Sequence, residues 1–258
     1  GIKIFDLNDQ SNRERLFNPH ENRVRRIPLY NDNQHMLTSG IDNIVLKWDL
    51  VTGLNQEFYN LDSPAQTIAI SGDDRYVAIG TKNGSLILYS GGSNTQPRLL
   101  LNEPNNQILS VAFTRKGNML ISGDQQGVLR IWTLDNNKLI YTRRLHQARI
   151  VDIRLDPSGK FIATCSTDGK VYLINTDAMN QVPVEVVSLS GFIFSIEFSN
   201  DGKTLFVANN NQSVITGYPV LADDLAKFIC PNVSRNLTLS EWSYYMGEEV
   251  PFEKTCNK

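Results

Sequence analysis

The sequence predicts an all-β fold, a β-propeller of repeated four-stranded blades, and two observations lead to this prediction. Its 258 residues are 41% hydrophobic and 20% charged, which supplies enough apolar side chains for a substantial core. Five similar segments recur, and the spacing of about 41 to 44 residues between their last large side chains is the period of one blade. These side chains are Trp48, Tyr89, Trp132, Ile174 and Tyr218, and Phe5 falls one period earlier.

Four short strands are expected in each repeat, and we name them a to d from the innermost outward. Alternating apolar residues mark strand a in VRRIPL, AQTIAI, ILSVAF, IVDIRL and IFSIEF, because a period of two is typical of a half-buried strand. Turn residues such as Asn200-Asp201-Gly202 follow, since Gly, Asn and Asp tolerate the positive φ of tight hairpins. The recurring segment then supplies strands b and c, and runs such as NRERLF supply strand d.

The repeats define one propeller domain over residues 1–220, because a blade buries both faces only when neighbouring blades stack on it. No amphipathic helix fits within this range. The predicted units are a partial blade at 1–22 and five full repeats at about 23–61, 62–104, 105–146, 147–189 and 190–220.

A Trp-Asp pair, Trp48-Asp49, closes strand c of the first full blade, and degraded pairs close the other repeats. The chain thereby resembles WD-repeat β-propellers, whose blades typically carry a buried hydrogen-bonded tetrad of His, Ser or Thr, Asp and Trp. Matched by position, the tetrad residues are His20, Thr38, Asp42 and Trp48 in the first full blade, and His146, Thr164 and Asp168 in the fourth.

The tetrad is incomplete in two blades. Ile174 stands where the fourth blade would have Trp, and the third blade keeps Ser122 and Trp132 but has Pro104 and Gln126 in the other places. Buried polar groups that satisfy one another fix strand register, so we interpret these residues as structural and not catalytic.

The resemblance also implies a closed ring of about seven blades. The chain opens on a strand c and its last repeat lacks an obvious strand d, so we expect it to be the C-terminal part of a longer polypeptide.

The tail, residues 221–258, is expected to be helical and to pack on the propeller. LADDLAKFIC fits a short helix, and Thr238 with Glu241 forms a capping box that predicts a second helix at about 239–246. This tail is similar to the segment that ends many bacterial multidomain signalling proteins, including STAND-type NTPases and caspase-like or CHAT protease fusions. Cys230 and Cys256 bracket it; a disulfide or a metal site is possible, and packed free thiols are favoured.

No catalytic residues and no cofactor are predicted, because the three histidines and the scattered carboxylates form no recognisable nucleophile and base. The alternative function is a propeller-type hydrolase or lactonase with a metal in the central channel. Against it, the strand-a runs contribute only Asp152 and Glu197, too few carboxylates to argue a metal site.

The favoured function is a non-catalytic scaffold or ligand-sensing propeller that binds a protein, a peptide or an upstream domain of the same polypeptide. Propellers of this family resemble one another in gripping partners with residues at the start of strand a and in the b–c turn. Carried over by position, this partner-binding face comprises Arg23, Arg25, Ile41, Gln66, Lys82, Gln107, Gln125, Arg149, Thr167, Phe194 and Asn211.

Charge and hydropathy exclude some partners at this stage. The formal net charge of −2 gives no field that would attract nucleic acid or an anionic membrane, and no apolar stretch approaches the length of a membrane helix. Three cysteines without a paired pattern favour a reducing compartment, so we expect a cytoplasmic protein.

Overall fold

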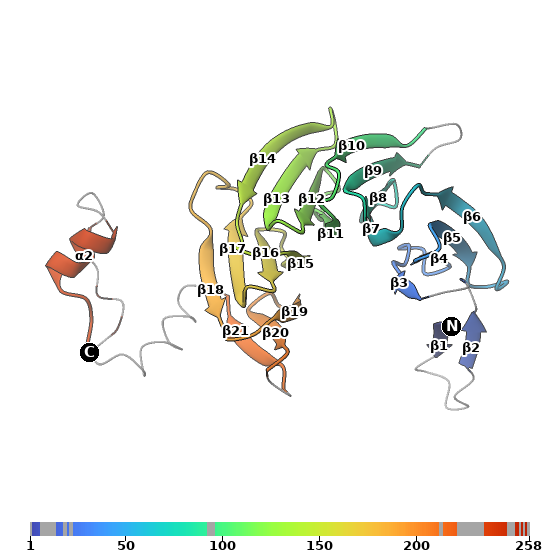
Figure 1. The fold of residues 1–258 in the computed structure, drawn as a ribbon. Coiled ribbons are helices and arrows are strands. Elements are labelled where there is room, and N and C mark those ends of the chain that lie inside the picture. Colours follow the sequence, from blue (N-terminus) through green and yellow to red (C-terminus); the bar gives the residue numbers. More distant parts are fainter. Residues whose placement is uncertain are drawn as a thin grey trace.

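The computed structural model is an arc of antiparallel sheets that follow one another in chain order (Figure 1). It describes residues 2–5, 14–17, 20, 23–91, 96–211, 214–220, 235–246, 251–252, 254 and 256. The repeated sheets confirm the predicted all-β propeller class, while the number of blades in a closed ring stays a prediction.

Four sheets have four strands each, in the order a, b, c, d. Blade 1 contains β3 (Val24–Arg26), β4 (His35–Gly40), β5 (Ile44–Asp49) and β6 (Asn55–Asn60). Blade 2 contains β7 (Ala65–Ile70), β8 (Tyr76–Thr81), β9 (Ser85–Ser90) and β10 (Arg98–Asn102). Blade 3 contains β11 (Ile108–Phe113), β12 (Met119–Asp124), β13 (Val128–Thr133) and β14 (Lys138–Arg144). Blade 4 contains β15 (Ile150–Leu155), β16 (Phe161–Ser166), β17 (Lys170–Asn175) and β18 (Val184–Ser188).

Two smaller sheets stand at the ends of the arc. A two-stranded sheet pairs β1 (Ile2–Phe5) with β2 (Glu14–Phe17), and it precedes blade 1. Blade 5 has three described strands, β19 (Ile193–Phe198), β20 (Thr204–Asn209) and β21 (Thr216–Pro219).

The core lies between the sheets, and each apolar cluster draws its residues from two consecutive units. Blades 3 and 4, for example, share a cluster in which Ile121 and Leu129 pack with Ile150 and Ile162. The same arrangement joins blade 1 to blade 2, blade 2 to blade 3, and blade 4 to blade 5. Each buried aliphatic side chain contributes about 1.5–3 kcal/mol, so a blade is stable mainly through its neighbours.

The b–c turns depend on glycine where they meet the segment that leads into the next blade. Gly127 has a φ of +80°, and a Cβ atom there would lie 2.3 Å from the carbonyl oxygen of His146. The N–H of Leu145 donates to the carbonyl oxygen of Gly127 at 2.9 Å. This close backbone approach holds the b–c turn of blade 3 against the start of blade 4.

The tail contains one described helix, α2 (Leu239–Met246), where the sequence predicts it. Thr238 and Glu241 form the capping box: the Glu241 N–H donates to Thr238 Oγ1 at 3.3 Å, and the Thr238 N–H donates to Glu241 Oε2 at 2.8 Å. The Arg235 guanidinium beside Glu241 lowers the pKa of that carboxyl to about 2.

Three other expectations about the tail concern its cysteines, its first helix and its packing. Cys256 is disulfide-bonded, so the expectation of a free thiol at this position is wrong; Cys230 and the helix predicted at LADDLAKFIC lie outside the described residues. In Figure 1, α2 lies apart from the sheets, and the packing of the tail on the propeller stays a prediction.

The glycine in the b–c turn provides a stability test. Gly127→Ala is expected to lower the free energy of unfolding by more than about 1 kcal/mol, because an L side chain is strained at positive φ and its Cβ meets backbone oxygens. Urea unfolding measures the change. Gly72→Ala is the matched control, because a Cβ at Gly72 meets only one atom, the Arg115 carbonyl oxygen, at 3.4 Å. An equal loss in both variants would contradict the argument.

Candidate functional site

We call the surface formed by the first residues of the innermost strands the mouth of the arc. Each of these strands has an irregularity in its pairing at the same position. In β3, β7, β11, β15 and β19 the pairing with strand b shifts register across the second residue, which is a β-bulge. A bulge leaves one residue outside the ladder and re-aims its side chain. The five bulged residues are Arg25, Gln66, Leu109, Val151 and Phe194.

The b–c turn of each blade is fixed against the start of its own strand a by one backbone hydrogen bond. The N–H of the first turn residue donates to the carbonyl oxygen of the residue before strand a, as from Gln125 to Gln107 at 2.9 Å. The same bond joins Ile41 to Arg23, Lys82 to Pro64, Thr167 to Arg149, and Asn210 to Phe192. The two groups of residues assigned to the partner-binding face therefore lie at the same end of each sheet.

Most side chains of the predicted face are exposed, with two differences from the expectation. Gln66 is only 5% exposed, so it lines the mouth without projecting from it. In blade 5 the residue equivalent to the other turn positions is Asn210, and Asn211 comes one residue later. Phe194 is 56% exposed and packs edge-on against Phe192, which is 50% exposed.

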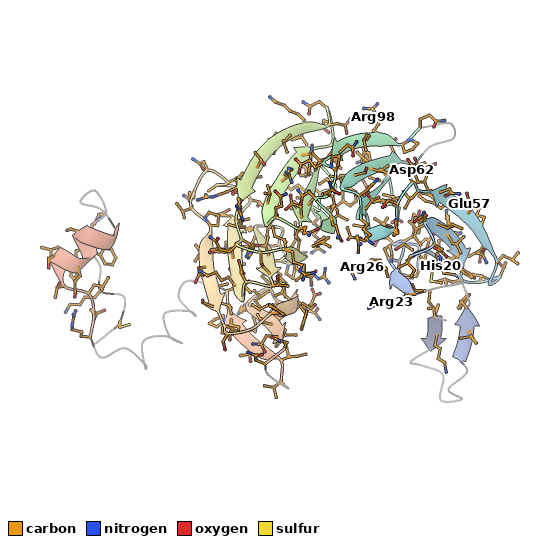
Figure 2. The ribbon with its side chains drawn as sticks, viewed as in Figure 1. His20, Arg23, Arg26, Glu57, Asp62 and Arg98 are labelled. Atoms are coloured by element: carbon orange, nitrogen blue, oxygen red, sulfur yellow. The ribbon has the colours of Figure 1, made fainter. Side chains whose placement is uncertain are left out.

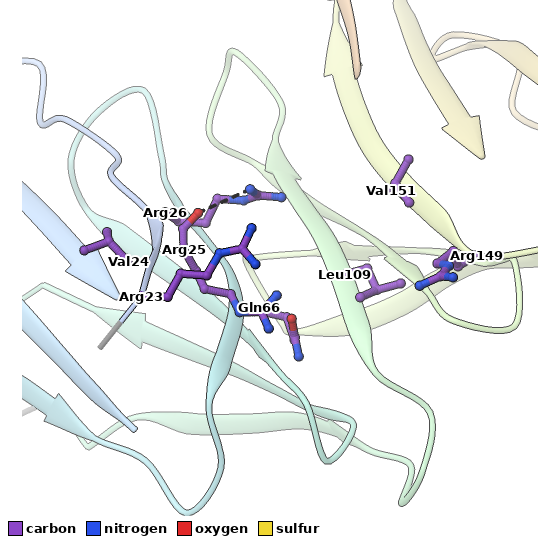
Figure 3. Close-up of a pocket in the computed structure, with 8 residues that line it drawn as sticks. All are labelled: Arg23, Val24, Arg25, Arg26, Gln66, Leu109, Arg149 and Val151. Carbon is purple, nitrogen blue, oxygen red and sulfur yellow. Dashed lines mark hydrogen bonds between the residues drawn. The ribbon is translucent and has the colours of Figure 1, made fainter. Parts of the chain in front are cut away.

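Arginines from two distant parts of the sequence gather at this mouth (Figure 3). Arg23, Arg25, Arg26 and Arg149 line a pocket with a volume of about 190 Å³, together with Gln66, Val24, Leu109 and Val151. Arg23 and Arg26 lie on the inner side of the arc, whereas Arg98 lies on an outer strand (Figure 2). Sequence reasoning placed Arg23, Arg25 and Arg149 on the face but did not find that they share a pocket.

The carboxylates of the inner strands are bound to protein groups. Asp152 accepts from Arg154 Nη1 at 2.8 Å and from Ser195 Oγ at 3.0 Å, and Glu197 accepts from Arg154 Nε at 2.9 Å. Burial raises the pKa of Asp152, and the Arg154 charge and these hydrogen bonds oppose that rise. Among the described residues, no three His, Cys, Asp or Glu side chains come together as a group that could hold a metal ion.

The predicted tetrad residues of blade 1 are joined by hydrogen bonds. His20 Nδ1 lies 2.8 Å from Asp42 Oδ2, His20 Nε2 lies 2.9 Å from Thr38 Oγ1, and Trp48 Nε1 donates to Thr38 Oγ1 at 3.1 Å. The arrangement is consistent with Nδ1–H donating to Asp42 while Nε2 accepts the Thr38 hydroxyl proton. Thr38 then uses both its donor and an acceptor inside the blade.

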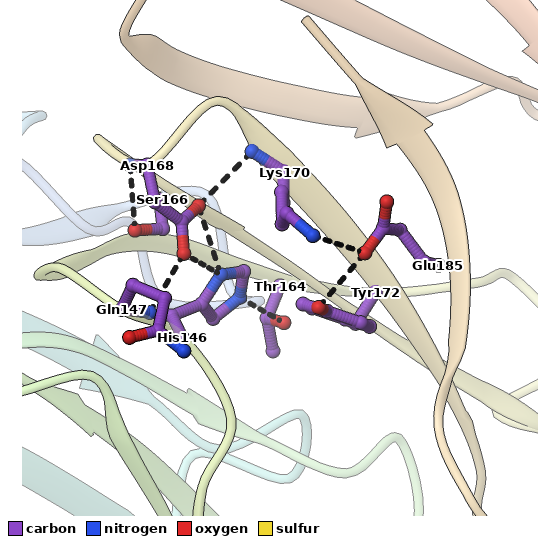
Figure 4. A network of polar contacts seen from close by, with 8 residues as sticks. All are labelled: His146, Gln147, Thr164, Ser166, Asp168, Lys170, Tyr172 and Glu185. Atoms are coloured by element: carbon purple, nitrogen blue, oxygen red, sulfur yellow. Dashed lines mark hydrogen bonds and ion pairs between the residues drawn. The ribbon is translucent and has the colours of Figure 1, made fainter.

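The fourth blade keeps the same network without the indole (Figure 4). His146 Nδ1 lies 3.1 Å from Asp168 Oδ2, and His146 Nε2 lies 2.9 Å from Thr164 Oγ1. Tyr172 packs edge-on against His146 at 4.9 Å between ring centroids. Burial raises the pKa of Asp168, but hydrogen bonds from His146 and from the Gln147 N–H outweigh it, so the pKa is lowered overall.

Blade 3 replaces the tetrad with a charged cluster that sequence reasoning missed. Asp124, which is fully buried, accepts from Arg130 Nη1 at 2.5 Å and from Asn106 Nδ2 at 2.9 Å. Arg130 Nη2 also donates to Glu103 Oε1 at 2.7 Å. Glu103 follows the last strand of blade 2, so the cluster ties two blades together. The available signal was a pair of opposite charges, Asp124 and Arg130, flanking a b–c turn.

Comparisons with known proteins agree with this architecture. A protein-family model described as the Vps42 beta-propeller matches residues 105–190, which are blades 3 and 4. The target of rapamycin complex subunit wat1 of Schizosaccharomyces pombe is 26% identical over 186 residues, 69% of this chain and 59% of that protein. The chain has a propeller fold of the WD-repeat type.

Two further relatives match most of this chain at low sequence identity. The protein LST8 homolog of Drosophila melanogaster is 24% identical over 186 residues, 68% of this chain and 59% of that protein. Transcription initiation factor TFIID subunit 5 of Caenorhabditis elegans is 20% identical over 212 residues, 82% of this chain and 32% of that protein. The matched part of this chain thus spans 59% of the length of each of the first two relatives.

Within the part of the chain that the structure describes, no helix is long and apolar enough to cross a membrane.

The two threonines of the His-containing networks give a matched pair of variants. Thr38→Val is expected to destabilise the propeller more than Thr164→Val, because it orphans a buried Trp N–H as well as a His nitrogen. Each buried group left unpaired costs about 1–3 kcal/mol. Denaturant unfolding of both variants measures the difference, and an equal or reversed order would contradict the assignment of the Trp48 bond.

Asp168 predicts a dependence of stability on pH. Its folded pKa lies below its unfolded value, so its contribution is present above the unfolded pKa, about 3.9, and is lost as the pH falls through the folded pKa. Asp168→Asn is therefore expected to be less stable than wild type at neutral pH, with a gap that narrows below about pH 4. Urea titrations across this range measure it, with the exposed Asp177→Asn as control. A gap that widens in acid would contradict the sign.

Proposed function

We propose that this propeller is a non-catalytic protein-binding scaffold whose partner sits on the mouth of the arc. The observation that carries the proposal is the repeated bulge, which in each of blades 1 to 5 leaves one inner-strand side chain outside the ladder at the same end of the sheet. The backbone of the bulged residue has the same place in each blade, whereas its side chain differs between blades: Arg, Gln, Leu, Val or Phe. Such a mixture of arginine, amide and aromatic groups suits a protein surface.

The relatives support protein partners by their names alone. Two of them are subunits, one of a target of rapamycin complex and one of a transcription initiation factor. We extend this to the present chain as a proposal: the propeller holds a protein or peptide, or an upstream domain of its own polypeptide.

The wider setting is also part of the proposal. The tail resembles the end of bacterial multidomain signalling proteins, which supports a role as the C-terminal sensor module of a larger cytoplasmic protein. The relatives named above come from a yeast, a fly and a worm and support the propeller alone.

Co-purification from the native host tests the face. The variant Arg25→Ala/Arg149→Ala/Phe194→Ala is expected to lose at least about tenfold of the partner recovered with wild type, because buried arginine and aromatic contacts dominate protein interfaces. The matched control, Arg98→Ala/Arg143→Ala/Leu139→Ala, removes two arginines and one exposed apolar side chain from outer strands. Partner recovery that survives the first variant and fails with the second would move the interface to the outer edge.

A further inference from the structure

The arginines that line the pocket at the mouth carry positive charge that the described part of the chain leaves largely without a counter-charge. Of its four arginines, Arg26 donates to the backbone oxygen of Arg25 at 3.3 Å (Figure 3). Within the described residues, the guanidinium groups of Arg23, Arg25 and Arg149 form no ion pair. Three unpaired guanidinium groups around a pocket of about 190 Å³ form an anion-binding arrangement, in a chain whose formal net charge is −2.

Asp152 is the carboxylate whose charge acts on Arg26, and it does not cancel the positive charge of the pocket. Asp152 attracts Arg26, but its oxygens are already bonded to Arg154 and Ser195. Burial lowers the pKa of Arg26, and the charges of Arg154 and Arg25 lower it further. Arg25 and Arg26 therefore repel each other, and an anion that enters the pocket relieves this repulsion.

We infer that this pocket binds the phosphoryl group of a phosphorylated side chain presented by a peptide segment of a partner protein. The inference deepens the proposed function and rests on it, since it names the chemistry of the partner at one point of the face.

The charge and shape of the pocket favour a phosphoryl group over a carboxylate. A phosphorylated side chain carries about −1.5 to −2 charges at neutral pH and three strong acceptor oxygens, whereas a carboxylate carries one charge and two oxygens. Guanidinium groups bind such oxygens through paired N–H donors. The apolar side chains of Val24, Leu109 and Val151 also line the pocket and reduce the screening of these contacts by water.

The surroundings of the pocket favour a peptide over a nucleic acid. None of the eight lining residues is aromatic, so the pocket lacks the stacking platforms on which single-stranded nucleic acids are held. At the same end of the sheets, Phe192 and Phe194 of blade 5 and the turn residue Gln125 of blade 3 are exposed. Apolar and amide groups of this kind are suited to the side chains and backbone of an extended peptide.

Fluorescence anisotropy with labelled peptide pools tests the inference on the full chain. The pools carry phosphoserine, serine or glutamate at the centre of randomised flanks. Wild type is expected to bind the phosphoserine pool at least about tenfold more tightly than the other two, with an affinity that falls as salt rises. Arg25→Gln/Arg149→Gln is expected to lose at least about tenfold per arginine.

The controls separate a charge effect at this pocket from a general one. Arg98→Gln/Arg143→Gln removes the same charge from outer strands and is expected to bind within about twofold of wild type. Circular dichroism melting checks that both double variants are folded, and Arg25→Lys, which keeps the charge but loses the paired donors, is expected to bind with intermediate affinity. An equal loss in the outer-strand control would overturn the inference.

Other outcomes overturn it in distinct ways. Equal binding of the glutamate pool would assign the pocket to acidic peptides, and inorganic phosphate that binds as tightly as the phosphopeptide would assign it to a free anion. Displacement by a mixed-sequence single-stranded oligonucleotide at equal phosphate concentration would assign it to nucleic acid. If co-purification depends on the face but phosphatase treatment of the extract does not reduce it, the proposed function stands and this inference fails.

Discussion

The stacking of one sheet on the next is the interaction on which the rest of this structure depends. Each apolar cluster formed by the described residues is shared between two consecutive units, so within this part of the chain the core of a blade always includes side chains of its neighbour. Burial between sheets therefore sets the arc, and the arc in turn brings residues from different repeats to one end. A local fault in one interface is expected to affect the two blades that share it before it affects the others.

Different polar networks fix the b–c turn in different blades. Blade 1 fixes its b–c turn with His20 and Asp42, and blade 3 does so with Arg130 and Asp124. A buried ion pair adds little net stability once desolvation is counted, but removal of one partner leaves a costly unpaired charge. These networks therefore specify the geometry of the turn more than they stabilise the fold, which is why one can replace another without change in the strand order.

The fold could be predicted from sequence because its signals are local. The period of the repeats, the alternation in strand a and the turn residues each lie within one blade, and the spacing of His20, Thr38, Asp42 and Trp48 is fixed by the four-strand unit. Features that depend on contact between repeats could not be predicted. Arg25 and Arg149 are far apart in sequence, and only the curvature of the arc places both at one pocket. The bulge is equally hidden, because the short apolar runs do not mark which residue lies outside the ladder.

The register shift in strand a also bears on how such a protein can change. The bulged residue has no cross-strand neighbour to satisfy, so its replacement leaves the ladder intact. Among the described residues, the hydrogen bonds between blades, such as those from Ser195 to Asp152 and from Arg130 to Glu103, are made by other positions. Because each ladder belongs to one blade, the effects of such substitutions on the stability of the scaffold are expected to add. Ligand preference can therefore evolve, or be engineered, one blade at a time, with each repeat acting as an interchangeable unit of recognition on an unaltered scaffold.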